Sequence, residues 1–415
     1  MSSSPTRSTR PFRADVRVAG GQALESVGAT RTVPVLEGTP EGVQAPWGPG
    51  ANGYMQGAKK DANGDVEAPT TPAETTDERE AQQWDMKMIK ADQAHKITDG
   101  SRNVLVGVLD SGIDPDHPDL QPNIDVANSV NCTNAGRPDT SATGWNPTTS
   151  DHGTHVAGTI AAARNGVGIV GVAPNVRMAA VKVVSNEGYI YPEFAVCGFV
   201  WAGEKHMDVT NNSYYVDPFE FWCSDQPDQA AAKEAVSRAV AWSTKQGVVH
   251  AAAAGNSAYD LSDKSAFTDP TSPNDGSPMV NRTLNDGCQD IPAELPGVAT
   301  VSSHTSTGAL SGFSNRGLGV IDVSAPGSSI LSTIVRNNGY GTKSGTSMAS
   351  PHVAGVLALM KSAHPELTPE QMVAKLRADA VDTACSTASG PACVGTPENK
   401  SYFGEGVVDA LKAVS

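Results

Sequence analysis

Short apolar runs alternate with amphipathic or small-residue segments from about residue 83 to the end of the chain. The run at 103–109 is apolar throughout, which is typical of a strand buried on both faces of a sheet. Further strands are expected at 176–184, 208–213, 247–254, 297–302 and 320–324. Helical spacing or small buried residues predict helices at 152–163, 192–206, 228–246, 348–362 and 368–379. This alternation predicts an α/β fold with a mostly parallel central sheet and helices on both faces.

The first part of the chain has a different character. It is rich in glycine, proline, threonine and acidic residues, and it has few periodic apolar segments. Such a composition is typical of chain that cannot bury enough apolar surface to fold. We therefore expect a low-complexity leader or degenerate pro-segment, largely disordered, at 1–81 and one folded domain at 82–415.

Composition and charge then limit the partners. The 415 residues carry a net charge of −15, which argues against nucleic acid or an anionic membrane surface as the main partner. No apolar run approaches the roughly 18 residues of a membrane-spanning helix. The first residues also lack the apolar stretch of a signal peptide.

The six cysteines, in contrast to the missing signal peptide, indicate an extracellular location. An even count in loop-like surroundings indicates disulfides and an oxidising, extracellular compartment. The missing signal peptide favours the alternative of six reduced thiols in the cytosol. We give the cysteines more weight and expect a secreted protein. No CxxC occurs, so structural zinc is not expected. The cysteines are Cys132, Cys197, Cys223, Cys288, Cys385 and Cys393.

Ser347 is the third residue of the segment GTSMASPHVAG, where a Gly-Thr turn runs into the predicted helix at 348–362. Free backbone N–H groups and the helix dipole favour negative charge at such a helix start. A nucleophile that generates an oxyanion beside itself would suit this place. Taken alone, however, such a serine is more often a simple helix cap.

Three further polar residues follow predicted strands or begin a predicted helix. Asp110 comes directly after the apolar run at 103–109, as a turn residue or as a functional carboxylate. His152 begins the helix at 152–163 and could act as a general base, or it could merely cap the helix. Asn256 follows the strand at 247–254, as a turn former or as an oxyanion donor. A metal role for His155 is rejected, because no HExxH pattern or matching carboxylate is present.

Together these residues make a complete set for acyl transfer. The segments DSGID at 110–114, HGTHVAG at 152–158, AGN at 254–256 and GTSMASP at 345–351 resemble the four signature segments of the subtilisin-like serine proteases, the subtilases. The resemblance covers about residue 83 to the C-terminus. It looks nearest to secreted actinobacterial members, in the neighbourhood of the lantibiotic-leader peptidases.

This resemblance implies a three-layer subtilisin-like fold and a serine endopeptidase that acts on extended polypeptide, without an organic cofactor. Ser347 would attack the carbonyl, His152 would carry the proton, and Asp110 would hold the imidazole tautomer. Asn256 and the Ser347 backbone N–H would bind the oxyanion. We expect a monomer.

The resemblance also suggests substrate positions. An edge strand for the peptide would comprise Ser213, Tyr214 and Tyr215, and one wall of the S1 subsite would comprise Ala253, Ala254 and Gly255. Most subtilases carry glycine where this chain has Tyr215, which counts against a deep P4 subsite. Asp290 would lie at the base of S1 and favour a basic P1 residue, unless it points to solvent as exposed loop residues do.

A structural calcium site is implied as well. Its oxygen ligands would be the side chains of Asp119 and Asn165 and the backbone carbonyls of Ala163, Val167 and Ile169. Glu80 or Asp77 would supply a sixth. Without the metal, the same segment would be a surface loop held by Asn165. For the cysteines, the resemblance implies the pairs Cys132–Cys197, Cys223–Cys288 and Cys385–Cys393.

Two alternative functions would each lack a residue of the catalytic triad. A catalytically silent subtilase-like binding protein would have lost part of the triad, and every part is present here. An acid-active peptidase of the sedolisin type replaces the histidine by glutamate, so His152 counts against it. A narrow-specificity processing peptidase and a scavenging protease stay open as alternatives, because both would use the same residues.

Overall fold

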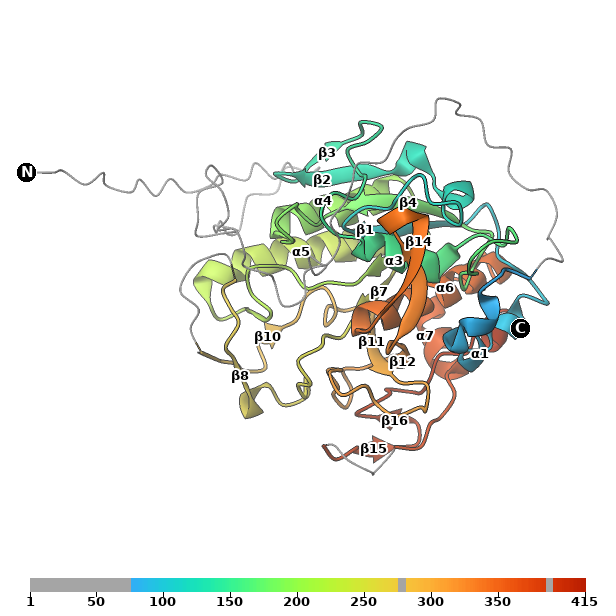
Figure 1. Ribbon diagram of the computed structural model, residues 1–415. Helices are drawn as coiled ribbons and strands as arrows, with labels where there is room; N and C mark the ends of the chain where they lie inside the picture. Colours follow the sequence, from blue (N-terminus) through green and yellow to red (C-terminus); the bar gives the residue numbers. More distant parts are fainter. Residues whose placement is uncertain (1–75, 275–280, 386–390) are drawn as a thin grey trace, which may run out of the picture.

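An eight-stranded sheet runs through the middle of the molecule and separates two layers of helices (Figure 1). The computed structural model describes residues 76–274, 281–385 and 391–415. The sheet order is β12-β11-β7-β5-β1-β4-β2-β3, and every pair is parallel except β2 with β3. Its strands are β1 (Leu105–Asp110), β2 (Val130–Asn134), β3 (Arg137–Asp139), β4 (Arg177–Lys182), β5 (Val209–Asn212), β7 (Val249–Ala253), β11 (Val298–His304) and β12 (Val323–Pro326).

The helices are distributed over both faces of this sheet. They are α1 (Trp84–Met88), α2 (Ala91–Ala94), α3 (His152–Ala161), α4 (Pro192–Glu204), α5 (Pro227–Lys245), α6 (Thr346–Ala363), α7 (Pro369–Asp379) and α8 (Ala410–Ala413). Helices α3 and α6 pack together on one face, and α4 and α5 pack together on the other (Figure 1). In the described ranges, no helix is long and apolar enough to cross a membrane.

Alternate side chains of strand β1 pack into two separate hydrophobic cores, one on each face of the sheet. Val106 and Val108 contribute to the core shared with α3 and α6, whereas Leu105 and Leu109 contribute to the core shared with α4 and α5. Successive side chains of a strand point to opposite faces, so a strand covered on both faces must be apolar throughout. The prediction of an α/β fold with helices on both faces is confirmed.

Short strand pairs lie outside the main sheet. They are β6 (Trp222–Cys223) with β10 (Cys288–Gln289), β8 (Thr268–Asp269) with β9 (Arg282–Thr283), β13 (Ile330–Ile334) with β14 (Gly339–Lys343), and β15 (Gly395–Thr396) with β16 (Asn399–Lys400). The apolar pattern of the sequence did not predict these pairs. Of them, the β13–β14 hairpin matters most here, because it leads directly into α6.

Residues before the predicted domain boundary at 82 already pack against the folded domain. Asp77 is buried, and the backbone N–H of Arg79 donates a hydrogen bond of 2.6 Å to the carbonyl of Gly168. Residues 76–81 are therefore part of the folded unit. The rest of the predicted leader, 1–75, lies outside the described residues.

Parallel order brings three strand ends to one edge of the sheet. Strands β1, β5 and β7 are neighbours, so Asp110, the segment after Asn212 and the segment after Ala253 meet at the carboxyl edge. In open α/β sheets, ligand sites form at this edge.

Candidate active site

Asp110 and His152 form a hydrogen-bonded pair at the carboxyl end of β1. His152 Nδ1 lies 2.9 Å from Asp110 Oδ1 and 3.0 Å from Asp110 Oδ2. The side chains are 11% and 2% exposed. Because a carboxylate only accepts, Nδ1 carries the proton and Nε2 is left as an acceptor in the neutral ring. This is the tautomer that a general base requires.

Glycine next to His152 allows the close approach of α3 to β1. A Cβ on Gly153 would lie 2.4 Å from the carbonyl oxygen of Gly112 and 3.1 Å from Asp110 Oδ1. The backbone N–H of Gly153 donates to the Ser111 hydroxyl at 3.0 Å. The sequence His-Gly at this helix start therefore brings the imidazole within reach of the strand end.

Ser347 is the second residue of α6, after the non-helical Gly345 that precedes the helix. The helix thus begins two residues before the predicted start at 348, and the serine does not cap it. Its hydroxyl donates to the Ser213 carbonyl at 3.2 Å, and the Ser213 hydroxyl donates back to the Ser347 carbonyl at 2.9 Å. In the described chain, no hydrogen bond joins this hydroxyl to His152. Catalytic hydrogen bonds are often completed only when substrate binds.

Asn256 lies beside the start of α6, and its amide has a fixed orientation. Its Oδ1 accepts from the Thr346 backbone N–H at 2.7 Å and from the Thr346 hydroxyl at 2.8 Å. Since both partners donate, the oxygen faces Thr346 and the NH₂ group is directed away from it. The backbone N–H of Ser347 belongs to the first turn of α6, where helical N–H groups have no partner within the helix.

The segment between β7 and Asn256 is held by a residue that the sequence did not single out. Asn315 Nδ2 donates to the Ala254 carbonyl at 2.9 Å, and the Asn315 backbone N–H donates to the Gly255 carbonyl at 2.8 Å. Gly255 has φ +105°, and a Cβ there would lie 2.2 Å from Asn315 Nδ2. Only glycine suits this turn. Ala253, Ala254 and Gly255 are all buried.

Ser213, Tyr214 and Tyr215 continue the chain beyond β5. All three are buried, and the Tyr215 hydroxyl accepts a hydrogen bond of 3.0 Å from Asn274 Nδ2. The bulky ring that replaces a glycine is thus packed inside the protein.

Asp290 does not point to solvent, so that alternative is wrong. It is 2% exposed, and its Oδ1 has no hydrogen-bond partner in the described chain. Its Oδ2 lies 3.5 Å from the position that a Cβ on Gly255 would take. Burial raises the pKa of Asp290 well above its usual range, and the neighbouring Glu294 and Glu220 raise this pKa further.

Glu220 is a second buried carboxylate that sequence reasoning missed. Its Oε1 accepts from the Ser257 hydroxyl at 3.1 Å, and its Oε2 accepts from Thr271 at 3.3 Å. Ser257 directly follows Asn256, so Glu220 lies behind the turn that carries the amide. The third acidic group, Glu294, forms a 2.6 Å ion pair with Lys264. No local sequence pattern marks Glu220, because its neighbours come from distant loops.

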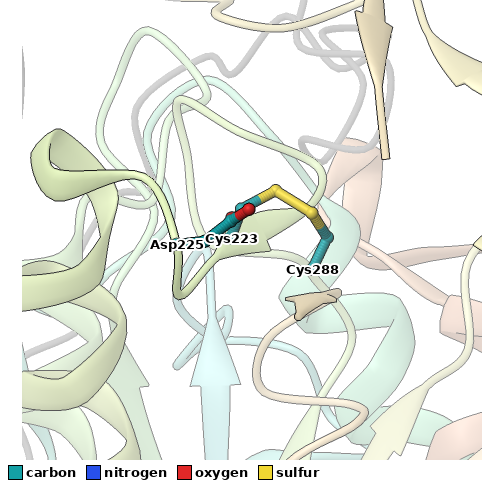
Figure 2. A group of neighbouring side chains, drawn as sticks. All are labelled: Cys223, Asp225 and Cys288. Atoms are coloured by element: carbon teal, nitrogen blue, oxygen red, sulfur yellow. A yellow bond between two sulfur atoms is a disulfide. The ribbon is translucent and has the colours of Figure 1, made fainter. Parts of the chain in front are cut away.

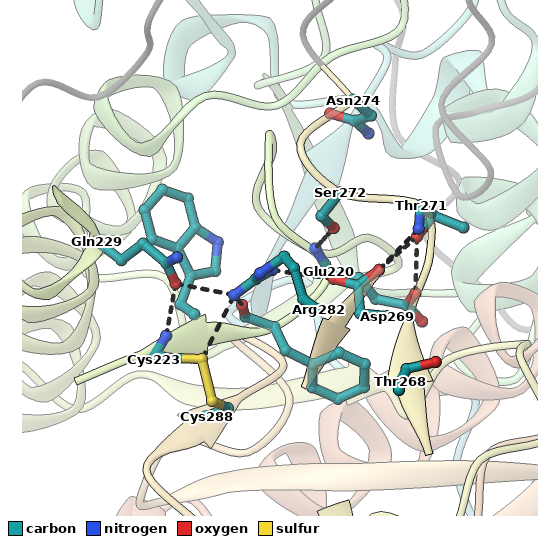
Figure 3. Close-up of polar contacts among 12 residues, drawn as sticks. Glu220, Cys223, Gln229, Thr268, Asp269, Thr271, Ser272, Asn274, Arg282 and Cys288 are labelled. Atoms are coloured by element: carbon teal, nitrogen blue, oxygen red, sulfur yellow. Dashed lines mark hydrogen bonds and ion pairs between the residues drawn. A yellow bond between two sulfur atoms is a disulfide. The ribbon is translucent and has the colours of Figure 1, made fainter. Parts of the chain in front are cut away.

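A polar network around Arg282 fixes the segment that carries Glu220 (Figure 3). Arg282 pairs with Asp269 at 3.0 Å and donates to the carbonyl of Phe221 at 3.0 Å. Thr271 joins the two acidic groups, because its hydroxyl also lies 2.9 Å from Asp269 Oδ1. The positive charge of Arg282 is therefore matched by Asp269, and the Thr271 hydroxyl connects this ion pair to Glu220.

The predicted calcium loop brings several oxygen atoms together. Asp119 Oδ2 accepts from the Ile169 backbone N–H and from the Tyr340 hydroxyl, whereas buried Asp119 Oδ1 has no partner in the described chain. The backbone carbonyls of Ala163, Val167 and Ile169 likewise accept no hydrogen bond from described residues. Asn165 instead uses its side chain within the protein, accepting from the Val167 N–H at 3.0 Å.

Of the two candidate sixth ligands, Asp77 fits and Glu80 does not. Asp77 Oδ1 accepts from the backbone N–H groups of Asn165 and Gly166, and buried Asp77 Oδ2 has no partner in the described chain. Glu80 contacts Arg164 at 3.2 Å. Burial raises the pKa of Asp77 and of Asp119 to about 6. Two desolvated carboxylates beside free carbonyls suit a hard divalent cation.

All six cysteines are paired as the resemblance implies, in the disulfides Cys132–Cys197, Cys223–Cys288 and Cys385–Cys393. Asp225 lies beside the second of these (Figure 2). This group resembles a metal site only in spacing, because a disulfide sulfur is not a thiolate and does not bind zinc as one.

Comparison with known proteins gives a consistent result. A family model described as the subtilase family matches residues 101–406. Subtilisin E of Bacillus subtilis is 34% identical over 330 residues, which are 80% of this chain and 70% of that protein. Subtilisin of Bacillus pumilus is 33% identical over 330 residues, covering 80% of this chain and 98% of that protein.

Among solved structures, the crystal structure of a lanthipeptide protease matches with a TM-score of 0.63 and 23% identity. The match covers 80% of this chain and 93% of that one. At this identity the likeness supports the three-layer fold alone.

Proposed function

The chain belongs to the subtilase family of serine-type endopeptidases, and we propose that Ser347, His152 and Asp110 are its catalytic triad. Ser347 would attack the carbonyl carbon of a peptide bond. His152 Nε2 would take the hydroxyl proton and return it to the departing amine. Asp110 would hold the tautomer and stabilise the imidazolium. The contact between Asp110 and His152 Nδ1, at 2.9 and 3.0 Å, carries this assignment.

The oxyanion would be bound at the start of α6. The NH₂ group of Asn256 and the backbone N–H of Ser347 would be its two donors, and the hydrogen bonds from Thr346 to Asn256 Oδ1 support this orientation of the amide. Donors placed before the reaction stabilise the developing charge without reorganisation. The Ser347→Ala variant tests the whole assignment, because it removes the nucleophile and leaves the donors in place.

For the substrate, we propose a polypeptide with a basic P1 residue. Asp290 and Glu220 are buried near Gly255 and Asn256, and Lys264, the cation that faces Asp290, is already paired with Glu294. A buried guanidinium or ammonium group from the substrate would meet the Asp290 carboxylate, whose Oδ1 has no hydrogen-bond partner in the described chain, with Glu220 close by. Tyr215, packed beside them, would close the subsite.

Peptides that differ only in P1 test this preference. We expect kcat/KM to be higher for P1 arginine than for its neutral isostere citrulline or for phenylalanine. Asp290→Asn and Glu220→Gln should each lower the arginine-to-citrulline ratio about tenfold, since a hydrogen bond to a charged group contributes ~1.5–3 kcal/mol. Asp225→Asn is the control, because it removes an exposed carboxylate beside the Cys223–Cys288 disulfide. This variant should leave the arginine-to-citrulline ratio unchanged. A preference for phenylalanine would contradict the proposal.

The same contact has a predictable pH dependence. The pKa of Asp290 is raised, so its carboxyl group is neutral at low pH and ionises as the pH rises. A cationic P1 side chain favours the ionised form. KM for the arginine peptide should therefore fall with rising pH, whereas KM for the citrulline peptide should not show this fall.

We further propose a structural Ca²⁺ held by Asp77, Asp119 and the carbonyls of the 163–169 loop. Bound there, the ion would neutralise two buried carboxylates and tie the start of the folded chain to that loop. The unpartnered oxygens Asp77 Oδ2 and Asp119 Oδ1 support this assignment. The three disulfides support a related proposal, that the protein works outside the cell in an oxidising compartment.

Thermal unfolding with and without calcium tests the metal site. Free Ca²⁺ at a hundredfold excess over Kd should stabilise the protein by about 2.7 kcal/mol, which raises Tm by roughly 4 °C for a folded unit of this size. Asp77→Asn should remove most of this shift, because it discharges one ligand. The neighbouring Glu80→Gln should keep it, because Glu80 contacts Arg164. Equal Tm values in EDTA and in calcium would argue against the site. If only Glu80→Gln lost the calcium-induced rise in Tm, Glu80 rather than Asp77 would be the ligand.

A further inference from the structure

The β13–β14 hairpin joins the two elements that carry the catalytic base and the nucleophile. Lys343, the last residue of β14, stands four positions before Ser347. The hairpin also lies against α3. Ser332 and Thr333 of β13 each donate a side-chain hydrogen bond of 2.7 Å to a backbone carbonyl of α3. The chain that delivers the serine is thus fastened to the helix that carries the histidine.

His155, one turn after His152, reinforces this attachment from the other side. Its Nε2 lies 3.0 Å from the carbonyl oxygen of Ile330 and 3.2 Å from that of Gly341. One ring nitrogen therefore contacts both strands of the hairpin. Burial and the nearby Lys343 lower the pKa of His155 to about 3, so the ring is neutral and Nε2 carries its single proton toward these carbonyls.

An ion pair completes the attachment at the end nearest to the chemistry. Lys343 Nζ lies 2.8 Å from Asp151 Oδ1, and the two side chains are 24% and 10% exposed. Asp151 precedes α3 at the position where an aspartate usually caps the helix, yet its side chain makes no capping hydrogen bond. Its carboxylate is directed at Lys343 instead.

We propose that Lys343 is a positioning residue, whose ion pair with Asp151 holds the start of α3 against the segment that leads to Ser347. The proposal rests on the triad proposed above. Ser347 donates to the Ser213 carbonyl in this structure, so its hydroxyl must turn toward His152 before proton transfer. The contacts that fix the distance between the start of α3 and the segment leading to Ser347 therefore determine how often the hydroxyl and the imidazole reach a reactive geometry.

The charges around His152 give Lys343 a second, measurable effect. Ionisable groups surround the start of α3: Asp110 bonds to the imidazole, His155 interacts electrostatically with both His152 and Lys343, and Asp151, next to His152 in the chain, pairs with Lys343. Lys343 is the cation among these described groups. Without it, the Asp151 carboxylate beside His152 would have no counterion, and the imidazolium would be favoured.

Three variants of the full-length chain test the proposal by kcat, KM, Tm and the pH profile of kcat/KM. Lys343→Met should lower kcat about fivefold with little change in KM, since the ion pair affects alignment and not substrate binding. The acid limb of the profile should move to higher pH by about 0.3 units. Lys343→Arg should restore both. Lys375→Met, which removes a similarly exposed 2.9 Å pair with Asp379 on α7, should change neither.

Asp151→Asn provides the counterpart. It breaks the same ion pair, so kcat should again fall, but it leaves Lys343 unmatched, so the acid limb should move to lower pH. The double variant should be no slower than either single variant. Because solvent reaches the Lys343 side chain, which is 24% exposed, the pair should contribute about 1 kcal/mol to stability, so Tm should change little in each case.

Other results would overturn the proposal. Wild-type kcat and an unmoved acid limb in Lys343→Met would show that the ion pair does not position the base. A loss confined to KM would make Lys343 a substrate contact. A fall in kcat that tracks Tm across all variants, Lys375→Met included, would reduce the effect to general stability. In each of these cases the wild-type protein would still hydrolyse peptide through Ser347, so the proposed triad would survive.

Discussion

Replacing Ser347 with alanine should reduce kcat by about 10⁶-fold, to the residual rate that binding and the oxyanion donors provide. That magnitude is the one known for the corresponding change in subtilisin and is carried over to this relative. The physical reason is local, because the hydroxyl is the atom that forms the acyl-enzyme. Its removal leaves His152 paired with Asp110 but without a proton to transfer. Steady-state hydrolysis of a chromogenic peptide measures the effect.

A second readout makes the serine prediction specific. A serine-directed phosphonate should add its mass to the Ser347 peptide of the wild type and to none in the variant. Ser362→Ala serves as the control, because that hydroxyl lies near the other end of α6 and bonds to the Ala358 carbonyl. It should retain activity and labelling. Peptide hydrolysis by a folded Ser347→Ala protein would refute the triad.

Replacing Asp110 with asparagine should lower kcat by about 10⁴-fold, the loss seen when the same change is made in a trypsin-like triad. The NH₂ group of asparagine would donate to His152 Nδ1, which now accepts. The ring proton would then reside on Nε2, where the Ser347 proton should go. The geometry stays the same and the tautomer becomes wrong. Comparison of kcat/KM across pH measures this loss.

Asp114→Asn is the matched control for that variant. Asp114 is also buried, and burial raises the pKa of its carboxyl group, but this group accepts a hydrogen bond from the Asp116 backbone N–H rather than from the imidazole. It should cost stability without the 10⁴-fold loss of activity. Equal losses in both variants would mean that any buried charge near β1 matters, and would contradict the specific role of Asp110.

The elements with strong periodicity could be predicted from the sequence. The apolar run of β1 and the small, apolar α6 are buried on all sides in the structure, so each position carries the same signal. The β13–β14 hairpin escaped prediction. Its second strand, Gly339–Lys343, has two glycines and no apolar alternation. Its first strand is attached to α3 by the side-chain hydrogen bonds of Ser332 and Thr333, which leave no periodic apolar signal.

The site residues likewise fall into those that the sequence predicts and those that it does not. Asp110, His152 and Asn256 stand at the ends or starts of predicted elements, so parallel topology alone suffices to bring them to one edge. Glu220, Asn315 and the choice of Asp77 over Glu80 depend on contacts between loops far apart in the chain. For Asp290 the sequence is compatible with both a solvent-exposed and a buried side chain, and its burial follows from the packing of such loops. No local pattern contains this information.

Helix α6 has a consequence for the time at which activity can arise during synthesis. Residues 346–363 provide both the nucleophile and a central helix of the core, and their partners, β1, β5 and α3, lie far upstream in the chain. A nascent chain that ends before this helix therefore lacks a reactive hydroxyl and cannot close one side of the sheet. Long-range closure of this kind is slow in folding. Proteolytic activity can therefore arise only after residues 346–363 have been synthesised and have packed against their upstream partners.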